Sequence, residues 1–454
     1  MNIVITDTFL EETMQNQPII NMGMTGHVSN GKSTLTKSLT GVATQRHTNE
    51  KVQNISIRLG YANAKIYKCP ICSAPECYQS TTSSVFEHKC KHCNSDTKLI
   101  THVSFTDCPG HNALMSTMLN GTCVMDYSIL VESTANATMP APQTVEHYNI
   151  TKKAGIPTKI VCLNKVELEN KTRSRAQGMI NTLRTFLSNH GDENIPIIPV
   201  SGAMNLNIDV LCQYISSLKV PEKNLTDDFK MLIIRSFNIN TPNTEICQLK
   251  GGVVGGSLVR GIIQIDQDVV IYPGYISKKS EQAKNDSGVL WQYKPLKCKT
   301  ISIKSDDNIL NYAIPGGLIG VQLNIDPATT GDDRLVGNVM FKYEKPHNEF
   351  KILEGIKVKY TKFTPNVQNS NGTPQIGYSL KINDPIKINI NSNNIKCTIV
   401  DMPTYDEILL DLEKPVCVEI GDKVTINIPT IGDNGILIFG HGIVIGGIES
   451  EVLL

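Results

Sequence analysis

The chain has 454 residues, and its 43 basic and 43 acidic side chains give a formal net charge of zero. This length is enough for two or three domains. The balanced charge excludes a general attraction to nucleic acid or to a membrane. No run reaches the ~20 apolar residues of a membrane helix, and the acidic N-terminal stretch does not fit a signal peptide. We therefore expect a cytoplasmic protein without membrane contact.

The first half of the chain alternates short apolar runs with helix-like stretches. This alternation predicts a mostly parallel sheet with helices on both faces. The expected strands cover residues 19–24, 99–106, 124–131, 158–163 and 195–200.

A phosphate-loop motif, Gly26-His-Val-Ser-Asn-Gly-Lys-Ser33, directly follows the first expected strand. In such a loop the backbone amides surround the phosphates, and the next helix adds its dipole. We expect the Lys32 ammonium to reach the β- and γ-phosphates and the Ser33 hydroxyl to ligate Mg²⁺. A chance glycine-rich turn is the alternative. The expected phosphate contacts are Gly26, Ser29, Asn30, Gly31, Lys32, Ser33 and Thr34.

Four cysteines follow at metal-ligand spacing, because Cys69-x2-Cys72 and Cys90-x2-Cys93 are separated by 17 residues. Four thiolates suit Zn²⁺, which would fix a segment too short for its own core. We predict one structural zinc in an insert at about residues 66–96, and reduced thiols without metal are the alternative. Possible substitute ligands are Cys77, His88 and His92. The remaining cysteines are isolated, and we expect them to be buried small hydrophobic side chains.

A second metal element is predicted where Asp107-Cys-Pro-Gly110 ends the expected strand 99–106. A carboxylate at a strand end can hold Mg²⁺ through water, and the amide of the following glycine can bond a γ-phosphate. By itself, the sequence Asp-x-Pro-Gly is also typical of an ordinary turn. Its place 74 positions after Ser33 favours the metal role.

Two later motifs are suited to reading a guanine base. Asn164-Lys165-Val166-Glu167 follows strand 158–163, and Ser201-Gly202-Ala203 follows strand 195–200. An Asn and a carboxylate three positions apart can bond the guanine edge, and the second motif can add a backbone donor. All these motifs stand at strand C-termini, where doubly wound sheets bind ligands. Their order therefore predicts a guanine-nucleotide site.

Beyond a polar linker at 220–228, short β-rich runs with Gly and Asn turns indicate β-barrels. The expected strands cover residues 231–237, 261–271, 318–325, 386–390, 424–428 and 435–445. A break near Lys345-Pro346 would separate two barrels. We predict an α/β P-loop GTPase domain followed by two β-barrel domains. The expected boundaries are an N-terminal tail at 1–18, the GTPase domain at 19–222, domain II at 229–345 and domain III at 346–454.

With these motifs, the chain resembles the family of gamma subunits of eukaryotic and archaeal translation initiation factor two, translational GTPases of the elongation-factor-Tu type. The resemblance covers nearly the whole chain from Ile19. Its most specific stretch is Asn54-Ile-Ser-Ile-Arg-Leu-Gly-Tyr-Ala-Asn-Ala-Lys-Ile-Tyr-Lys68. Further matches are Leu119-Asn-Gly121, Leu249-Lys-Gly-Gly-Val-Val-Gly-Gly256 and Ile314-Pro-Gly-Gly-Leu-Ile-Gly320. General elongation factors lack this long stretch and the cysteine insert.

The resemblance implies that the GTP form grips initiator methionyl-tRNA between the first two domains and delivers it to the small ribosomal subunit. It implies tRNA contacts at Asn54 and Tyr61, although Tyr61 could simply pack on the sheet. It places Ser56 at the switch position that ligates Mg²⁺. His111 stands where the family orients the attacking water, so His111 and Lys32 are the candidate catalytic residues. The implied partners are alpha and beta subunits and, as GTPase activator, initiation factor five.

The chain departs from the family pattern at three site positions. Asn30 replaces a usual His and Gly202 a usual Ala, and we expect both changes to be mild. Glu167 replaces the Asp that reads guanine, which bears on base selectivity.

The sequence disfavours three alternative functions. A selenocysteine-specific elongation factor is disfavoured by the cysteine insert and by the stretch Gly60-Tyr-Ala-Asn-Ala-Lys65. A nucleotide-binding scaffold without hydrolysis is disfavoured because Ser56, Asp107 and His111 are all present. A zinc-ribbon adaptor for nucleic acid leaves the phosphate loop unexplained.

Overall fold

The computed structural model of the chain describes residues 7–44, 59–110, 115–168, 173–279, 288–343, 350–362, 379–429 and 436–453. The chain divides into two compact units. Unit 1 comprises residues 1–229, 255–265 and 301–321, and unit 2 comprises 230–254, 266–300 and 322–454. Within the described ranges, no helix is long and apolar enough to cross a membrane.

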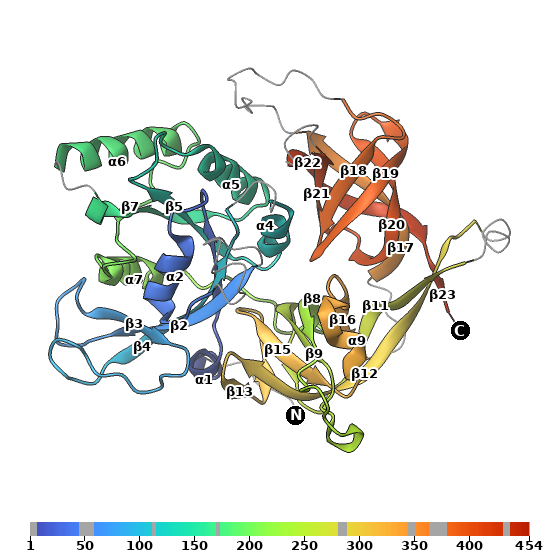
Figure 1. Cartoon of the computed structure of the whole chain (residues 1–454), viewed down its shortest axis with the longest axis horizontal. Coiled ribbons are helices and arrows are strands. Elements are labelled where there is room, and N and C mark those ends of the chain that lie inside the picture. The colour runs from blue at the N-terminus through green and yellow to red at the C-terminus, as the bar shows by residue number, and fades with distance from the viewer. Residues whose placement is uncertain are drawn as a thin grey trace. The chain divides into compact units, whose positions relative to one another are not determined.

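Unit 1 contains a seven-stranded sheet in the order β3-β2-β4-β1-β5-β6-β7. Strands of this sheet are coloured blue to green in Figure 1. Strands β4, β1, β5, β6 and β7 are parallel, whereas β2 runs antiparallel to both of its neighbours. This confirms the α/β prediction, since the parallel strands coincide with the expected runs. The strands are β1 (Ile20–Thr25), β2 (Gly60–Lys68), β3 (Tyr78–Thr82), β4 (Lys98–Asp107), β5 (Tyr127–Ser133), β6 (Thr158–Asn164) and β7 (Ile197–Pro199).

Strand β2 was not among the expected strands. Ala62, Ala64 and Ile66 do alternate with polar residues, but alanine carries little hydrophobic signal. The polar face of β2 is nevertheless buried, because other segments of the chain provide hydrogen-bond partners for its side chains. The Asn63 amide donates to Ser305 Oγ at 3.4 Å, in the part of unit 1 formed by residues 301–321.

Helices cover both faces of this sheet (Figure 1). On one face α2 (Lys32–Thr40) and α7 (Ile208–Ser216) pack on alternate side chains of the strands. On the other face α5 (Pro142–Lys153) and α6 (Arg173–Ser188) pack on the intervening ones. With both faces buried, the strand ends are left for polar chemistry. The other helices in the described part of this unit are α1 (Asp7–Asn16), α4 (Met115–Thr122) and the 3₁₀ turn η2 (Val166–Leu168).

Helix α1 lies within the segment expected as an N-terminal tail, and it packs on residues 301–321 of the same unit. Phe9 stacks on Tyr312 with ring centroids 5.0 Å apart. The buried Gln17 amide donates to Ile314 O at 2.5 Å and accepts from Ile314 N at 3.1 Å. These paired bonds satisfy both ends of a buried polar side chain, so they fix segment 301–321 to the N-terminal part of the chain.

The second half of the chain forms two barrels, as predicted. In the first, strands β11-β16-β8-β9-β15-β12 close into a ring through pairing of β11 with β12, and β13 and β23 extend it. The second is a closed barrel in the order β17-β20-β19-β18-β21-β22. The boundaries of the GTPase domain and of domains II and III remain predictions. The expected break at Lys345-Pro346 lies outside the described residues, and segment 220–228, expected as a linker, has neither helix nor strand.

The strands of this half are β8 (Lys230–Phe237), β9 (Val253–Arg260), β10 (Ile263–Gln264), β11 (Asp268–Lys278), β12 (Trp291–Ser305), β13 (Asn308–Leu310), β14 (Tyr312–Ala313), β15 (Ile319–Leu323), β16 (Val339–Lys342), β17 (Phe350–Lys362), β18 (Pro385–Ile390), β19 (Asn393–Thr404), β20 (Glu407–Glu419), β21 (Lys423–Pro429), β22 (Ile436–Glu449) and β23 (Glu451–Val452). Short helices are η3 (Ile246–Gln248), α9 (Pro327–Thr330) and η4 (Gly331–Asp333).

The prediction of a single strand at residues 261–271 is wrong. A turn with positive φ at Asp266 separates β10 from β11.

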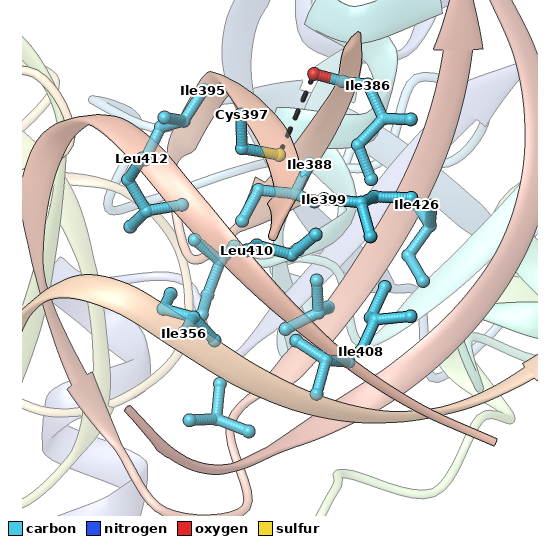
Figure 2. Close-up of a cluster of buried hydrophobic side chains, with 14 of the residues drawn as sticks. Ile356, Ile386, Ile388, Ile395, Cys397, Ile399, Ile408, Leu410, Leu412 and Ile426 are labelled. Carbon is cyan, nitrogen blue, oxygen red and sulfur yellow. Dashed lines mark hydrogen bonds between the residues drawn. The ribbon is translucent and has the colours of Figure 1, made fainter. Parts of the chain in front are cut away.

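The core of the second barrel consists of aliphatic side chains that alternate along its strands (Figure 2). Cys397 lies among them, and its thiol donates to Ile386 O at 3.7 Å. Burial raises the pKa of Cys397 to about 12, so this thiol is an inert packing group. Most of the isolated cysteines are buried as expected, but Cys247 is exposed because it lies on the short surface turn η3.

A buried ion pair in unit 2 joins the start of β8 to the turn between β20 and β21. The Lys230 side chain is 4% exposed, and its Nζ lies 2.8 Å from Glu419 Oε2 and 3.3 Å from Asp422 Oδ1. The Asn391 amide donates to Asp422 Oδ2 at 3.2 Å. Each carboxylate therefore has a partner at a site largely closed to water.

Replacing Lys230 with alanine should destabilise unit 2 by about 3–5 kcal/mol, because it leaves two carboxylates poorly solvated and without their cation. Trp291, the only tryptophan of the chain, belongs to this unit, so its fluorescence during urea unfolding reports the change. Lys357→Ala is the matched control. That ion pair to Glu407 has the same 2.8 Å separation, but its lysine is 37% exposed. We expect its loss to cost less than ~1 kcal/mol, and equal losses would contradict the prediction.

Candidate functional site

The predicted nucleotide motifs all stand at the C-terminal ends of parallel strands in unit 1. The phosphate loop follows β1, Asp107 ends β4, Asn164 ends β6 and Ser201 follows β7. Parallel strands end at the same edge of a sheet, where open α/β sheets bind their ligands. The structure therefore brings together motifs that are more than 170 positions apart in the sequence.

The phosphate loop needs its two glycines for space as well as for backbone conformation. Gly26 has φ +133°, and a Cβ there would lie 2.1 Å from the carbonyl oxygen of Val131. Gly31 has φ +88°, and a Cβ there would lie 2.4 Å from Nδ2 of Asn164. Any side chain at either position would force the loop away from its neighbours. Ser29 and Thr34 are exposed beside this loop, and Ser33 is partly exposed.

Lys32 begins helix α2 and folds back over the loop. Its Nζ donates to the carbonyl oxygens of Gly26 at 2.9 Å and His27 at 2.8 Å, and the residue is only 6% exposed. Burial lowers the pKa of Lys32, and the charge of Asp107 opposes that effect. An anion beside this ammonium would favour its charged form further, which suits a phosphate site.

The segment 107–110 lies directly against the phosphate loop. The fully buried Asp107 accepts a hydrogen bond from Thr44 Oγ1 at 2.6 Å. A Cβ on Gly110 would lie 2.6 Å from Lys32 Nζ and 2.7 Å from the amide nitrogen of Val28. The backbone of Gly110 can approach so closely because it has no side chain, as its predicted phosphate role requires. The predicted residues Asn54, Ser56 and His111 lie outside the described residues.

Asn164 connects the phosphate loop to the segment at Ser201. Its side-chain amide donates to Asn30 O at 2.9 Å, and its Oδ1 accepts from the Gly202 amide at 3.1 Å. A Cβ on Gly202 would lie 3.0 Å from the backbone of Leu35 on α2, so this loop packs tightly on the first turn of the helix.

The other residues that are predicted to bind the guanine base lie around Asn164. Lys165 has φ +63°, and its carbonyl accepts a hydrogen bond from Thr134 Oγ1 at 2.8 Å. Ser201 is buried and caps the amide of Met204, whereas Ala203 is exposed. Within the described residues, the buried Oε2 of Glu167 has no hydrogen-bond partner. A buried acceptor without a donor costs free energy, and the donors of a guanine edge would satisfy it.

Asn30 acts through its side chain as well as its backbone. It is fully buried, its amide donates to Val131 O at 2.7 Å, and its Oδ1 accepts from Asn136 Nδ2 at 2.9 Å. Asn30 therefore holds the loop against β5 through its side chain.

Sequence reasoning missed three residues that contact the phosphate loop from helix α5. His147 Nδ1, Thr144 Oγ1 and Gln143 Oε1 accept hydrogen bonds from successive loop amides. They belong to no motif identified in the sequence and lie 115 to 121 positions after their partners. The available signal was a group of polar residues on one face at the start of an otherwise packed helix.

The four predicted metal-ligating cysteines converge in unit 1, between β2 and β4. Their sulfur atoms all lie within 4.8 Å of one another. Cys69 Sγ is 3.4 Å from Cys93 Sγ, and Cys72 Sγ is 3.7 Å from Cys90 Sγ. Tetrahedral zinc with ~2.3 Å bonds places sulfur atoms about 3.8 Å apart, so this arrangement is compatible with zinc. Hydrogen bonding, first from Ser95, lowers the pKa of Cys69 to about 6, whereas hydrogen bonding with Cys93 and burial raise the pKa of Cys72. Without a metal, therefore, only part of the cluster favours the thiolate form.

The possible substitute ligands are not part of this four-sulfur cluster. His88 Nδ1 shares a hydrogen bond with Thr97 Oγ1 at 3.0 Å, and its ring stacks on Tyr67. Cys77 is buried next to the cluster, and its carbonyl accepts from the Cys69 amide at 2.8 Å. These residues therefore support the insert by packing and hydrogen bonding.

The predicted tRNA residue Tyr61 lies at the start of β2, beside the nucleotide site. In the β2–β4 ladder Gly60 is opposite Asp107, and Tyr61 is opposite Thr106. Tyr61 is partly exposed.

Comparison with protein families gives two matches. The model for the elongation factor Tu GTP binding domain matches residues 17–221, and the model for initiation factor eIF2 gamma, C terminal, matches residues 354–442. The eukaryotic translation initiation factor 2 subunit gamma of Schizosaccharomyces pombe is 37% identical over 418 residues, which cover 91% of each chain. The protein of the same name from Encephalitozoon cuniculi is 36% identical over 97% of this chain and 96% of its own.

Solved structures of translational GTPases share the fold. The bacterial selenocysteine-specific elongation factor EF-Sec superposes with a TM-score of 0.66 at 20% identity over 94% of this chain. This chain spans 58% of the length of that protein. The elongation factor SelB of Methanococcus maripaludis, in complex with the GTP analogue GppNHp, gives a TM-score of 0.65 at 18% identity, covering 95% of this chain and 80% of its own. At such low identity these likenesses concern the fold alone.

Proposed function

Because the chain belongs to the family of gamma subunits of eukaryotic translation initiation factor 2, we propose that it carries initiator methionyl-tRNA to the small ribosomal subunit in its GTP-bound form. The chain is a translation initiation GTPase that binds GTP and GDP. Its relatives are subunits of a larger factor by name, which supports assembly with other subunits. We propose that these are alpha and beta subunits and that the complex is cytoplasmic. We also propose that initiation factor five is its GTPase activator.

In this proposal the phosphate loop and Lys32 hold the nucleotide phosphates, and Asn164, Glu167 and the Ser201 segment hold the base. Ser33, Ser56 and Asp107 would hold Mg²⁺, which neutralises charge on the β- and γ-phosphates when bound. His111 would orient the water that attacks the γ-phosphate, and Lys32 would stabilise the charge that develops there. The proximity of Lys32, Asp107 and Gly110 supports these roles.

One observation carries the tRNA proposal. Gly60 is the register partner of Asp107, so β2 begins directly opposite the candidate magnesium residue. Tyr61 is the next residue along the strand, and stacking on aromatic rings is a common way to bind an unpaired nucleotide end. An ordering of segment 54–59 by Mg²⁺ and the γ-phosphate would therefore act on the residue that is proposed to meet the tRNA.

We expect the assembled heterotrimer to bind initiator methionyl-tRNA at least tenfold more tightly with GTP than with GDP, because only GTP carries the γ-phosphate that would act on this segment. Equilibrium titration of labelled tRNA measures the difference, with an elongator tRNA as the specificity control. Tyr61→Ala should weaken tRNA binding about tenfold through lost stacking of ~1–3 kcal/mol, whereas Tyr61→Phe keeps the ring and the affinity. Equal tRNA affinity with the two nucleotides would refute the switch.

We further propose that the four-cysteine cluster holds one structural Zn²⁺. The expected result of elemental analysis is about one zinc per chain, lost on Cys90→Ser together with local stability of the insert. Cys77→Ser is the matched control, because Cys77 is buried in the same insert but lies outside the four-sulfur cluster. Freely titratable thiols without bound zinc in the wild-type protein would contradict the proposal.

With Glu167, the site should stay selective for guanine but bind it less tightly than a site with Asp would. The Glu167 side chain is one methylene longer than the usual Asp, so a bidentate pair with the base is displaced and loses roughly 1 kcal/mol. We therefore expect Glu167→Asp to tighten GTP binding about fivefold, with GTP still strongly preferred to ATP.

Competition titrations with GTP, ATP and xanthosine triphosphate test this expectation. Glu193→Asp provides the control, because Glu193 is an exposed glutamate of the same unit. An unchanged GTP affinity would mean that the loop already places Glu167 where an Asp would sit. Comparable ATP affinity would overturn the assignment of this site to guanine.

A further inference from the structure

We propose that Gln143, Thr144 and His147 of helix α5 are positioning residues of the nucleotide site, which hold the phosphate loop in its binding conformation. The inference rests on GTP binding and is independent of the proposed tRNA role. If it is correct, guanine-nucleotide affinity depends on a helix outside the motifs that bind phosphate, magnesium and base.

The evidence is a set of hydrogen bonds from three successive amides at the start of the loop. The Gly26 amide donates to His147 Nδ1 at 3.0 Å and the His27 amide to Thr144 Oγ1 at 3.1 Å. The Val28 amide donates to Gln143 Oε1 at 3.2 Å. The three acceptors are side chains within a turn and a half of α5, so one helix bonds all three amides at this end of the loop.

Thr144 has a second partner that extends the restraint along the loop. Its Oγ1 also accepts from Asn30 Nδ2 at 3.3 Å, and the Asn30 carbonyl receives the Asn164 amide. The loop is thus held by α5 on one side and by Asn164 on the other. Its later amides, from Ser29 onward, are not bonded by the three α5 side chains.

The loop needs such external support because its backbone is strained. Ser29 has φ +62°, a left-handed conformation that a non-glycine residue adopts at a cost. Gly26 and Gly31 also have positive φ values, which glycine adopts without this cost. Strained conformations persist only where the surroundings support them. The α5 acceptors bond the three residues before Ser29, and Thr144 also bonds the Asn30 side chain after it, so the support lies on both sides of Ser29.

The protonation state of His147 suits an acceptor role. The residue is fully buried, and burial, followed by the charge of Lys32, lowers the pKa of His147 to about 3. A neutral imidazole has one acceptor nitrogen, and the bond from Gly26 assigns that role to Nδ1. His147 therefore stays an acceptor throughout the physiological pH range.

The start of α5 is itself anchored to the sheet. Glu132, near the end of β5, accepts from the Ala141 amide at 3.3 Å, and it also accepts from Asn136. The same Asn136 amide donates to Asn30 Oδ1 at 2.9 Å. Strand β5, helix α5 and the phosphate loop therefore form one hydrogen-bonded assembly in which the helix has a defined position.

The test compares two isosteric changes in one helix. Thr144→Val removes the hydroxyl that bonds the loop, whereas Thr151→Val removes an equally buried hydroxyl that bonds only carbonyls of α5 itself. Titration with a fluorescent GDP analogue should show about a tenfold rise in Kd for Thr144→Val and less than a twofold change for Thr151→Val. Equal effects of the two variants would overturn the proposal.

A rescue experiment at His147 separates positioning from packing. His147→Leu should raise the Kd of GDP about tenfold, while His147→Asn, whose Oδ1 can replace the Nδ1 acceptor, should recover most of the affinity. Asparagine and leucine variants that bind equally weakly would show that His147 acts only by filling space. Should the buried variants fold poorly by thermal melting, Gln143→Met tests the third, partly exposed contact, and unchanged affinity in that variant would also contradict the inference.

Discussion

The arrangement of the candidate nucleotide site depends on the side-chain amide of Asn164, which is buried and makes a donor and an acceptor bond at once. It donates to the Asn30 carbonyl of the phosphate loop and accepts from the Gly202 amide of the loop after β7. Aspartate could not make both bonds, since a carboxylate only accepts. The close approach of Gly31 and Gly202 to their neighbours follows from this bridge, because any side chain there would push the loops apart.

The residues that sequence analysis located are those whose role can be recognised from a few neighbours in the chain. Lys32, Asp107 and Asn164 each follow an apolar run within a short motif, so strand and site were predicted together. His147 could not be found this way, because its partner Gly26 lies 121 positions earlier and only the fold joins them. The same holds for Gln17, whose buried amide is satisfied 297 positions later by Ile314. Strand β2 was missed because other segments, rather than its own hydrophobicity, account for its burial.

Fold and family give different information about this chain. The elongation factors EF-Sec and SelB share its fold at 18–20% identity, whereas the gamma subunits share 36–37% of its residues along nearly the whole length. A common fold can support several activities, so the site residues and the insert discriminate better than the superposition does. The cysteine insert and the stretch that leads into it, which separated the two alternatives in the sequence, both belong to β2 and the segment that follows it.

The antiparallel pairing of β2 has a mechanical consequence. At one end Gly60 is opposite Asp107, and at the other Lys68 leads directly into Cys69 of the four-sulfur cluster. A slip of β2 by one residue would turn every side chain to the opposite face, exchanging the buried alanines for Asn63 and Lys65. The proposed zinc would oppose such a slip because it would fix the far end of the strand, about 30 Å away for nine residues at ~3.4 Å each. With zinc bound, the insert would thereby hold the register of the strand that begins opposite Asp107.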